Sequence, residues 1–264
     1  MCRWAAYIGT PIFLSDVLCD PGHSLIKQSQ LAMECKTPTN GDGFGLAWYD
    51  HRPEPGQYRD VYPAWADPNL RSLAEQVRSG LFMAHVRAST GTATSRNNCH
   101  PFVVGQHSFV HNGQVGGYDQ FRKGADMLIP DHLYAHRKGA TDSEAVFLVA
   151  CGLGLAQDAH GAMMASVAQF EAMSRATGKG PHMRLSAALA DGDRLYAIRY
   201  ASDDKAPSLY YRQNDNREGW TVVSEPLETQ GAGWQAVPAG SFCSFDRTRV
   251  TIQPFAPEVS QRAA

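Results

Sequence analysis

The order of the expected secondary-structure elements constrains the fold more than any other feature of the sequence. β-Prone runs occupy the first part of the chain, two helical segments follow at 142–155 and 159–176, and short strands continue from residue 184. A strict alternation of strand and helix builds a parallel sheet, whereas strands grouped before and after helices build mainly antiparallel sheets. The order therefore predicts an α+β protein in which helices cover two mainly antiparallel sheets.

Capping and turn residues indicate where individual elements begin. The expected helices with a capping residue are 24–32 with Ser24, 68–78 with Asp67 before Pro68, and 142–155 with Thr141 and Glu144 as a capping box. The expected strands are 2–9, 44–49, 81–87, 109–111, 184–190, 194–200, 208–212, 220–224, 241–245 and 249–253. Residues 191–193, Asp-Gly-Asp, predict a hairpin turn, and the proline-containing residues 51–66 predict an exposed connection.

Charge and cysteine usage exclude several classes of function. Lys plus Arg number 24 and Asp plus Glu number 26, with no basic run, so the chain is not expected to bind nucleic acid. The six cysteines form no C-x-x-C pair and the ten histidines no H-E-x-x-H motif, so no metal is expected. The uncharged, apolar stretch 145–157 is too short to cross a bilayer. We expect a reduced cytoplasmic protein, with no signal peptide, nucleotide or organic cofactor.

Cys2 is the first residue with unusual chemistry. Removal of the initiator Met1, which a small second residue permits, would leave a thiol and a free α-amine on Cys2. An α-amine titrates near about 7.7–8.0, so part of it is unprotonated at neutral pH and can accept the thiol proton. This arrangement predicts nucleophilic catalysis by an N-terminal cysteine. The alternatives, that Met1 stays on the chain or that Cys2 is an ordinary apolar cysteine, remain open at this point.

Five short motifs follow Cys2 in a fixed order. They are NGDGFG at 40–45, AHVRAST at 84–90, NCHPF at 98–102, HNG at 111–113 and TDSE at 141–144. With the initial Met-Cys-Arg, the set resembles the class II glutamine amidotransferase domain, an N-terminal-nucleophile hydrolase. The Met-Cys-Arg-Trp start and the later Ser-Glu-Pro-Leu at 224–227 most resemble its stand-alone, YafJ-like members, whose relatives hydrolyse γ-glutamyl compounds. The resemblance covers about residues 2–227 and implies a four-layer αββα fold. We expect one domain over 2–254 and a tail at 255–264.

The resemblance also implies roles for individual residues. Cys2 matches the nucleophile, and Asn112 and Gly113 match the oxyanion hole, where two uncharged N–H donors stabilise a developing negative charge. Arg87 matches the residue that binds the substrate α-carboxylate, and Asp142 the one that holds the α-ammonium. Each has a simpler alternative: a hairpin turn at Asn-Gly, a surface arginine, and a first-turn helix acid.

The remaining candidate positions have supporting roles. Ser89 and Thr90 are expected at the carboxylate end of the substrate. His85 and His100 are expected to support the site without acting as acid–base catalysts. Ser224, with Glu225, is expected to support the N-terminal amine.

The expected reaction is hydrolysis of a γ-glutamyl amide bond, which converts glutamine to glutamate and ammonia. Two alternatives stay open: the substrate is a γ-glutamyl peptide or thiol conjugate, or the chain is a catalytically silent binding module on the same fold. A papain-like hydrolase is disfavoured by the strand pattern and the position of Cys2. The motifs and closing strands occupy most of the 264 residues, which leaves no room for a synthetase domain. We therefore expect a stand-alone hydrolase or an ammonia-accepting partner on a separate chain.

Overall fold

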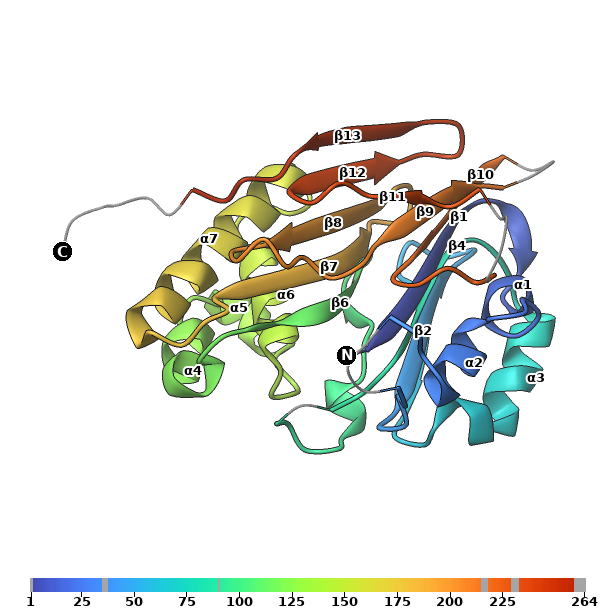
Figure 1. The fold of residues 1–264 in the computed structure, drawn as a ribbon, viewed down its shortest axis with the longest axis horizontal. Coiled ribbons are helices and arrows are strands. Elements are labelled where there is room, and N and C mark those ends of the chain that lie inside the picture. Colours follow the sequence, from blue (N-terminus) through green and yellow to red (C-terminus); the bar gives the residue numbers. More distant parts are fainter. Residues whose placement is uncertain (1, 35–37, 90, 215–217, 229–232, 259–264) are drawn as a thin grey trace.

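Two antiparallel sheets lie face to face, and a group of helices covers the outer face of each (Figure 1). The computed structural model describes residues 2–34, 38–89, 91–214, 218–228 and 233–258. The first sheet has the order β11 (Gln235–Ala236), β9 (Tyr210–Gln213), β10 (Gly219–Val223), β1 (Arg3–Phe13), β4 (Arg78–Val86), β2 (Phe44–Tyr49), β3 (Gly56–Asp60). The second has the order β13 (Val250–Pro254), β12 (Ser241–Phe245), β8 (Leu195–Ala201), β7 (Met183–Ala190), β6 (His107–Val115), β5 (Phe102–Val104).

The helices divide between the two outer faces, which gives the four αββα layers predicted from the sequence. The first sheet carries α1 (Ser15–Leu18), α2 (Leu25–Gln30), α3 (Pro68–Gln76) and the 3₁₀ turn η1 (Ala64–Ala66). The second carries α4 (Tyr118–Asp126), α5 (Asp131–Tyr134), α6 (Asp142–Gly152) and α7 (Ala159–Thr177). No helix within the described ranges is both long and apolar enough to cross a membrane.

Strand β1 shows how both faces of a sheet become buried. Trp4, Ala6 and Ile8 lie in the core between the sheets, whereas Ala5 and Tyr7 pack on the side of helices α1–α3. Successive side chains of a strand point to opposite faces. Because helices cover one face and the second sheet covers the other, the strand is a continuous apolar run with no alternation of polarity.

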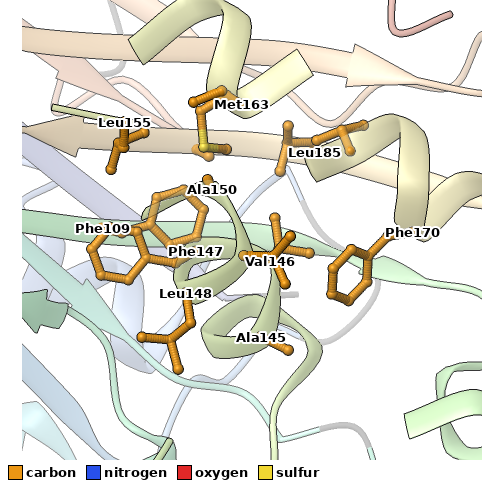
Figure 2. Close-up of a cluster of buried hydrophobic side chains, with 14 of the residues drawn as sticks. Phe109, Ala145, Val146, Phe147, Leu148, Ala150, Leu155, Met163, Phe170 and Leu185 are labelled. Carbon is orange, nitrogen blue, oxygen red and sulfur yellow. The ribbon is translucent and has the colours of Figure 1, made fainter. Parts of the chain in front are cut away.

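Helix α6 is apolar on all sides because it lies between the second sheet and α7. Phe147 of α6 stacks on Phe109 of β6 with ring centroids 5.3 Å apart, and Val146 and Leu148 belong to the same core (Figure 2). A helix that is hydrophobic all round is expected to be buried. This packing holds the first turn of α6 against β6, where the candidate site lies.

The predicted helix caps are confirmed. Ser24 accepts a hydrogen bond from Lys27 N, Asp67 accepts from Asn69 N and Leu70 N, and Thr141 accepts from Glu144 N. The capping box at α6 is only half formed, however. The Glu144 carboxylate accepts from the backbone N–H groups of residues 138 and 139 and pairs with Arg137 at 2.8 Å, because the preceding loop brings these donors to it.

The prediction of an exposed connection over 51–66 is wrong in part. Residues 56–60 form the edge strand β3, which pairs with β2, and η1 follows with Ala64 buried. The prolines at 53, 55 and 63 flank this strand and do not interrupt its hydrogen bonds. The Asp191 turn is confirmed, since its carboxylate accepts from Asp193 N and Arg194 N between β7 and β8. After β13, Phe255 is buried against Phe242.

Candidate active site

The start of β1 and the chain that follows β4 lie side by side. Arg3 of β1 is in register with Val86 of β4, so Cys2 lies beside residues 87–89. The Ala88 N–H donates to Cys2 Sγ over 3.4 Å, and the thiol donates to the Ala88 carbonyl oxygen over 3.5 Å. The thiol is therefore held against the chain that carries Arg87.

The same end of β1 also contacts the second sheet. Trp4 Nε1 donates to the Ser186 carbonyl oxygen over 3.1 Å, and Ser186 of β7 is in register with Asn112 of β6. Strands β1 and β6 are in contact across the core. Cys2, two residues before Trp4, and Asn112 therefore belong to one region, where the start of β1 meets β6 and β7. Figure 1 shows β6 and β7 beside the blue strand β1.

Asn112 and Gly113 lie within β6, paired with Ser186 and Leu185, so the hairpin-turn alternative is wrong. The Asn112 side chain is buried, and neither Oδ1 nor Nδ2 has a hydrogen-bond partner among the described residues. Buried polar atoms are nearly always paired in folded proteins. An unpaired buried amide N–H is therefore a donor available to an oxygen atom of a ligand.

The backbone conformation at position 113 and the atoms around it both require a glycine. Its φ is +153°, and a Cβ atom here would lie 1.8 Å from the Arg184 carbonyl oxygen and 2.6 Å from His111 Nε2. A backbone oxygen cannot move away without disturbing the β6–β7 pairing. Glycine is therefore the residue that allows β6 and β7 to approach here.

We expect Gly113→Ala to lower the free energy of unfolding by about 3 kcal/mol or more, because the new methyl group overlaps the backbone of β7. Gly178→Ala is the matched control, since Gly178 has φ +70° but a Cβ there meets no atom within 4 Å. That variant should lose only about 1–2 kcal/mol from backbone strain. Urea denaturation measures both, and equal losses would contradict the overlap.

Arg87 is buried, so the alternative of a surface arginine is wrong. Its Nη2 donates to Ser89 Oγ over 3.0 Å and to Thr92 Oγ1 over 2.7 Å, and its Nη1 donates to the Asp42 carbonyl oxygen over 3.2 Å. No carboxylate of the described residues lies within 4.0 Å of the guanidinium. A buried arginine without a counter-ion suits an anionic ligand group.

The loop at residues 40–43 is hydrogen-bonded to Arg87 and to Ser89. The Asp42 carboxylate accepts from Ser89 N over 2.7 Å, the Asp42 N–H donates to the Arg87 carbonyl oxygen, and the Arg87 N–H donates to the Gly43 carbonyl oxygen. Thr90 lies outside the described residues, and Thr92, which sequence reasoning missed, contacts the guanidinium. The Ser- and Thr-rich composition of the loop at 88–98 was the sequence signal that could have indicated this contact.

Asp142 begins α6 and joins it to β6. Its Oδ2 accepts from Val115 N over 2.8 Å and its Oδ1 from Ser143 N over 2.8 Å. The next residue, Ser143, makes a 2.7 Å hydrogen bond to His111 Nδ1. His111 directly precedes Asn112 in β6. Asp142 is half-buried, and no cation of the described residues lies within 4.0 Å of it. It thus carries a negative charge that a ligand cation can neutralise.

His85 and His100 form a buried pair beneath the Arg87 chain, with ring centroids 4.3 Å apart. Burial, helped by the charge of Arg87, lowers the pKa of His85 to about 3, and burial beside His85 lowers the pKa of His100 well below its ordinary value. Both rings are therefore neutral at pH 7 and are weak bases there. Their packing agrees with a supporting role.

The Cys2 side chain needs a base to react. Burial raises the pKa of its thiol above the ordinary value, and the Ala88 hydrogen bond and the charge of Arg87 oppose this rise without reversing it. The thiolate is the reactive form of cysteine. At neutral pH the group is a thiol, so a role as nucleophile would require a neighbouring acceptor for its proton.

Ser224 and Glu225 lie behind Cys2. Ser224 Oγ accepts from Trp4 N over 3.0 Å, and the Glu225 carboxylate pairs with Arg3 Nε over 2.7 Å. These contacts hold the two residues that follow Cys2, and the hydrogen bonds of the described residues include none between Ser224 and the Cys2 backbone nitrogen. Sequence reasoning named Glu225 but missed its ion-pair partner Arg3, although Arg3 stands next to Cys2 in the chain.

Comparison with known proteins identifies the family. Residues 19–264 match the family described as glutamine amidotransferases class-II. A Saccharomyces cerevisiae protein named probable glutamine amidotransferase DUG3 is 31% identical, over 99% of this chain and 86% of its own length. The γ-glutamyl-hercynylcysteine sulfoxide hydrolase of Mycolicibacterium smegmatis is 28% identical, over 96% of this chain and 100% of its own.

Solved structures agree with the family match. A glutamine aminotransferase class-II domain protein from Silicibacter pomeroyi is 50% identical with a TM-score of 0.79, over 97% of this chain and 100% of that one. The glutamine phosphoribosylpyrophosphate amidotransferase of B. subtilis, 11% identical with a TM-score of 0.61 over 98% of this chain and 50% of that one, shares the fold. The αββα layers are those of the N-terminal-nucleophile hydrolases, as the sequence predicts. The chain belongs to the class II glutamine amidotransferases and is an enzyme of the amidohydrolase type.

Proposed function

We propose that this enzyme hydrolyses γ-glutamyl amide bonds with Cys2 as the nucleophile, after Met1 has been removed. The observation that supports the proposal is that Arg87 and Asp142 have no counter-ion among the described residues, while Arg87 lies beside the Cys2 contact at Ala88 and Asp142 is bonded to β6, the strand of Asn112. The free α-carboxylate and α-ammonium of a glutamyl group supply the two missing charges. A bidentate arginine contact then orients the substrate.

The chemistry follows from the same residues. The Cys2 α-amine accepts the thiol proton, and Sγ attacks the γ-carbonyl carbon of the substrate. The oxygen that becomes negative is stabilised by the Asn112 side-chain N–H and the Gly113 backbone N–H. The C–N bond breaks as the Cys2 ammonium donates its proton to the leaving nitrogen, which leaves a γ-glutamyl thioester on Sγ. Water hydrolyses this thioester, with the amine again taking a proton, and releases glutamate and the free thiol.

Two substrate classes fit this site. Glutamine is the substrate that the family description suggests, whereas the Mycolicibacterium smegmatis relative is named for a γ-glutamyl compound with a larger amine portion. Both present the same α-carboxylate and α-ammonium to Arg87 and Asp142, so these two residues do not discriminate between them. We propose the γ-glutamyl group as the recognised portion, with the leaving amine left to experiment.

Glutamate release across a substrate panel tests the proposal. The panel contains glutamine, γ-glutamylcysteine, glutathione and γ-glutamyl-p-nitroanilide, with N-acetylglutamine and glutamine α-methyl ester as analogues that lack one charge. We expect release from at least one substrate with both charges, and a drop of about 10²-fold or more in kcat/KM for the analogues, because a buried charge is then left unpaired. Intact mass verifies that Met1 is absent. No release from any member would contradict the proposal, as would equal release from the analogues.

A further inference from the structure

A buried ion pair lies directly behind Cys2. The Arg3 and Glu225 side chains are 1% and 2% exposed, and Arg3 Nε lies 2.7 Å from Glu225 Oε2. Burying two charges is unfavourable unless they are paired and their remaining hydrogen-bonding groups are satisfied. The pair joins the beginning of β1 to the chain that follows β10, which are remote in sequence.

Both oxygens of the Glu225 carboxylate take part in hydrogen bonds. Its Oε1 lies 2.6 Å from His23 Nε2 and accepts from Met33 N over 2.8 Å, and its Oε2 accepts from Glu34 N over 3.0 Å. Burial alone raises the pKa of this group, but these bonds and the Arg3 charge lower it below the ordinary value. Glu225 is therefore a fixed carboxylate at neutral pH, held by two segments of the chain besides β1, at His23 and at Met33–Glu34.

The Arg3 guanidinium connects the fixed Glu225 carboxylate to Cys2. Nε forms an ion pair with Glu225 but has no hydrogen-bond partner among the described residues, whereas Nη1 donates to the Cys2 carbonyl oxygen over 3.2 Å and Nη2 donates to the Glu34 carbonyl oxygen. On the other side of Arg3, the Trp4 N–H donates to Ser224 Oγ over 3.0 Å. A planar guanidinium holds several acceptors in one fixed geometry, which a lysine ammonium does not.

An N-terminal residue has a chain neighbour on one side only. Once Met1 is removed, the position of the Cys2 Cα atom depends on its peptide plane with Arg3, and the carbonyl oxygen is the atom of that plane that Arg3 holds. The amine can then change its position only by rotation about the Cα–C bond, and the thiol also by rotation about the Cα–Cβ bond; the Ala88 contacts with Sγ restrict both rotations. Without the guanidinium, the reactive residue would move as a flexible chain end.

We propose that Arg3 and Glu225 are positioning residues that fix the N-terminal Cys2 through its carbonyl oxygen. The proposal rests on the proposed function, in which Cys2 supplies both nucleophile and base. Neither residue touches the substrate. Their effect is on the geometry of attack, where a misplacement of about 1 Å lowers the rate by about 10²-fold.

Four proteins test this inference: wild type, Arg3→Met, Glu225→Gln and Glu171→Gln. Arg3→Met is the informative variant because Glu225 keeps its contacts with His23, Met33 and Glu34. Glu171→Gln is the matched control, since Glu171 is also a buried carboxylate, paired with Arg175 and bonded to Tyr200 on α7 and β8, away from Cys2.

Two measurements separate positioning from general stability. The first is kcat and KM for the best substrate of the panel, at a temperature where circular dichroism shows every variant folded. The second is the rate at which iodoacetamide alkylates Cys2, followed by mass spectrometry of the N-terminal peptide from pH 5 to 10. We expect Arg3→Met to lower kcat by about 10²-fold with KM within about threefold. The alkylation profile should move to higher pH, because the amine no longer stays beside the thiol.

The outcomes are distinct. The inference is overturned if Arg3→Met keeps kcat within about threefold of wild type, or if Glu171→Gln loses as much kcat as Arg3→Met, or if the alkylation profile is unchanged. If Glu225→Gln does not fold, Arg3→Met alone decides. Cys2→Ser is assayed in parallel. Activity retained in Cys2→Ser defeats the proposed function, whereas an active wild type with an inactive Cys2→Ser and an unaffected Arg3→Met defeats only this inference.

Discussion

Replacing Cys2 by serine is expected to lower glutamate release by about 10³-fold or more, because removing a nucleophile removes the covalent route and leaves only binding and the oxyanion donors. A serine hydroxyl is a far weaker nucleophile than a thiol at neutral pH. Serine is also small, so the removal of Met1 should be unaffected, and intact mass checks this. The rate is measured as glutamate released per enzyme, and rapid acid quenching with mass spectrometry should detect the γ-glutamyl thioester on wild type only.

Cys19→Ser serves as the control for this prediction. Cys19 is a half-buried free cysteine that follows α1 on the outer face of the first sheet. It should retain wild-type kcat within about twofold, in line with the small effects of substitutions away from special features. Full activity of Cys2→Ser, or a comparable loss in Cys19→Ser, would show that Cys2 is not the nucleophile.

Asn112→Ala is expected to lower kcat by about 10²–10³-fold, because one donor of an oxyanion hole contributes about 3 kcal/mol to the barrier. KM should change little, since the charge on the substrate oxygen develops only in the transition state. The same substitution should leave the free energy of unfolding within about 1 kcal/mol of wild type. The Asn112 amide makes no hydrogen bond with the described residues, so its removal breaks none of them.

Asn98→Ala provides the opposite pattern. Asn98 is buried too, but its Nδ2 donates to the Ala93 carbonyl oxygen and its Oδ1 accepts from Ala140 N, each over 2.8 Å. Its loss should lower the free energy of unfolding by about 1–3 kcal/mol, because buried backbone groups lose their partners. Urea denaturation and steady-state kinetics on both variants check the contrast. A destabilised Asn112→Ala with unchanged kcat would assign Asn112 to the scaffold.

Much of the fold could be predicted from local patterns. The capped starts of α2, α3 and α6 were found because their signals lie within one helical turn of the cap. The edge strand β3 was missed because three prolines around it resemble an open connection, and only its pairing with β2 makes it a strand. Helices α4 and α5 were also missed. No side chain caps either helix at its first residue.

The candidate site, too, could be predicted only in part from local sequence patterns. Cys2, the Asn112-Gly113 pair, Arg87 and Asp142 were found as residue types in an ordered series of motifs. Whether Asn112 and Gly113 form a turn or belong to a strand could not be decided from two residues, because Asn-Gly is equally a hairpin signal. Pairing with β7 decides it, and the overlap that a Cβ at Gly113 would make with the Arg184 carbonyl oxygen supplies the reason.

The sequence by itself determined which chemical groups this enzyme carries and the order in which they occur, because each motif is read within a few residues. Only the tertiary structure decided which charges are paired. Arg3 lies in β1 and Arg87 directly follows β4, and both are buried, yet Arg3 forms an ion pair with Glu225 and Arg87 forms none with a described carboxylate. That difference arises because β10 pairs with β1 and places Glu225 behind Cys2, and such a register between remote strands depends on the packing of both sheets.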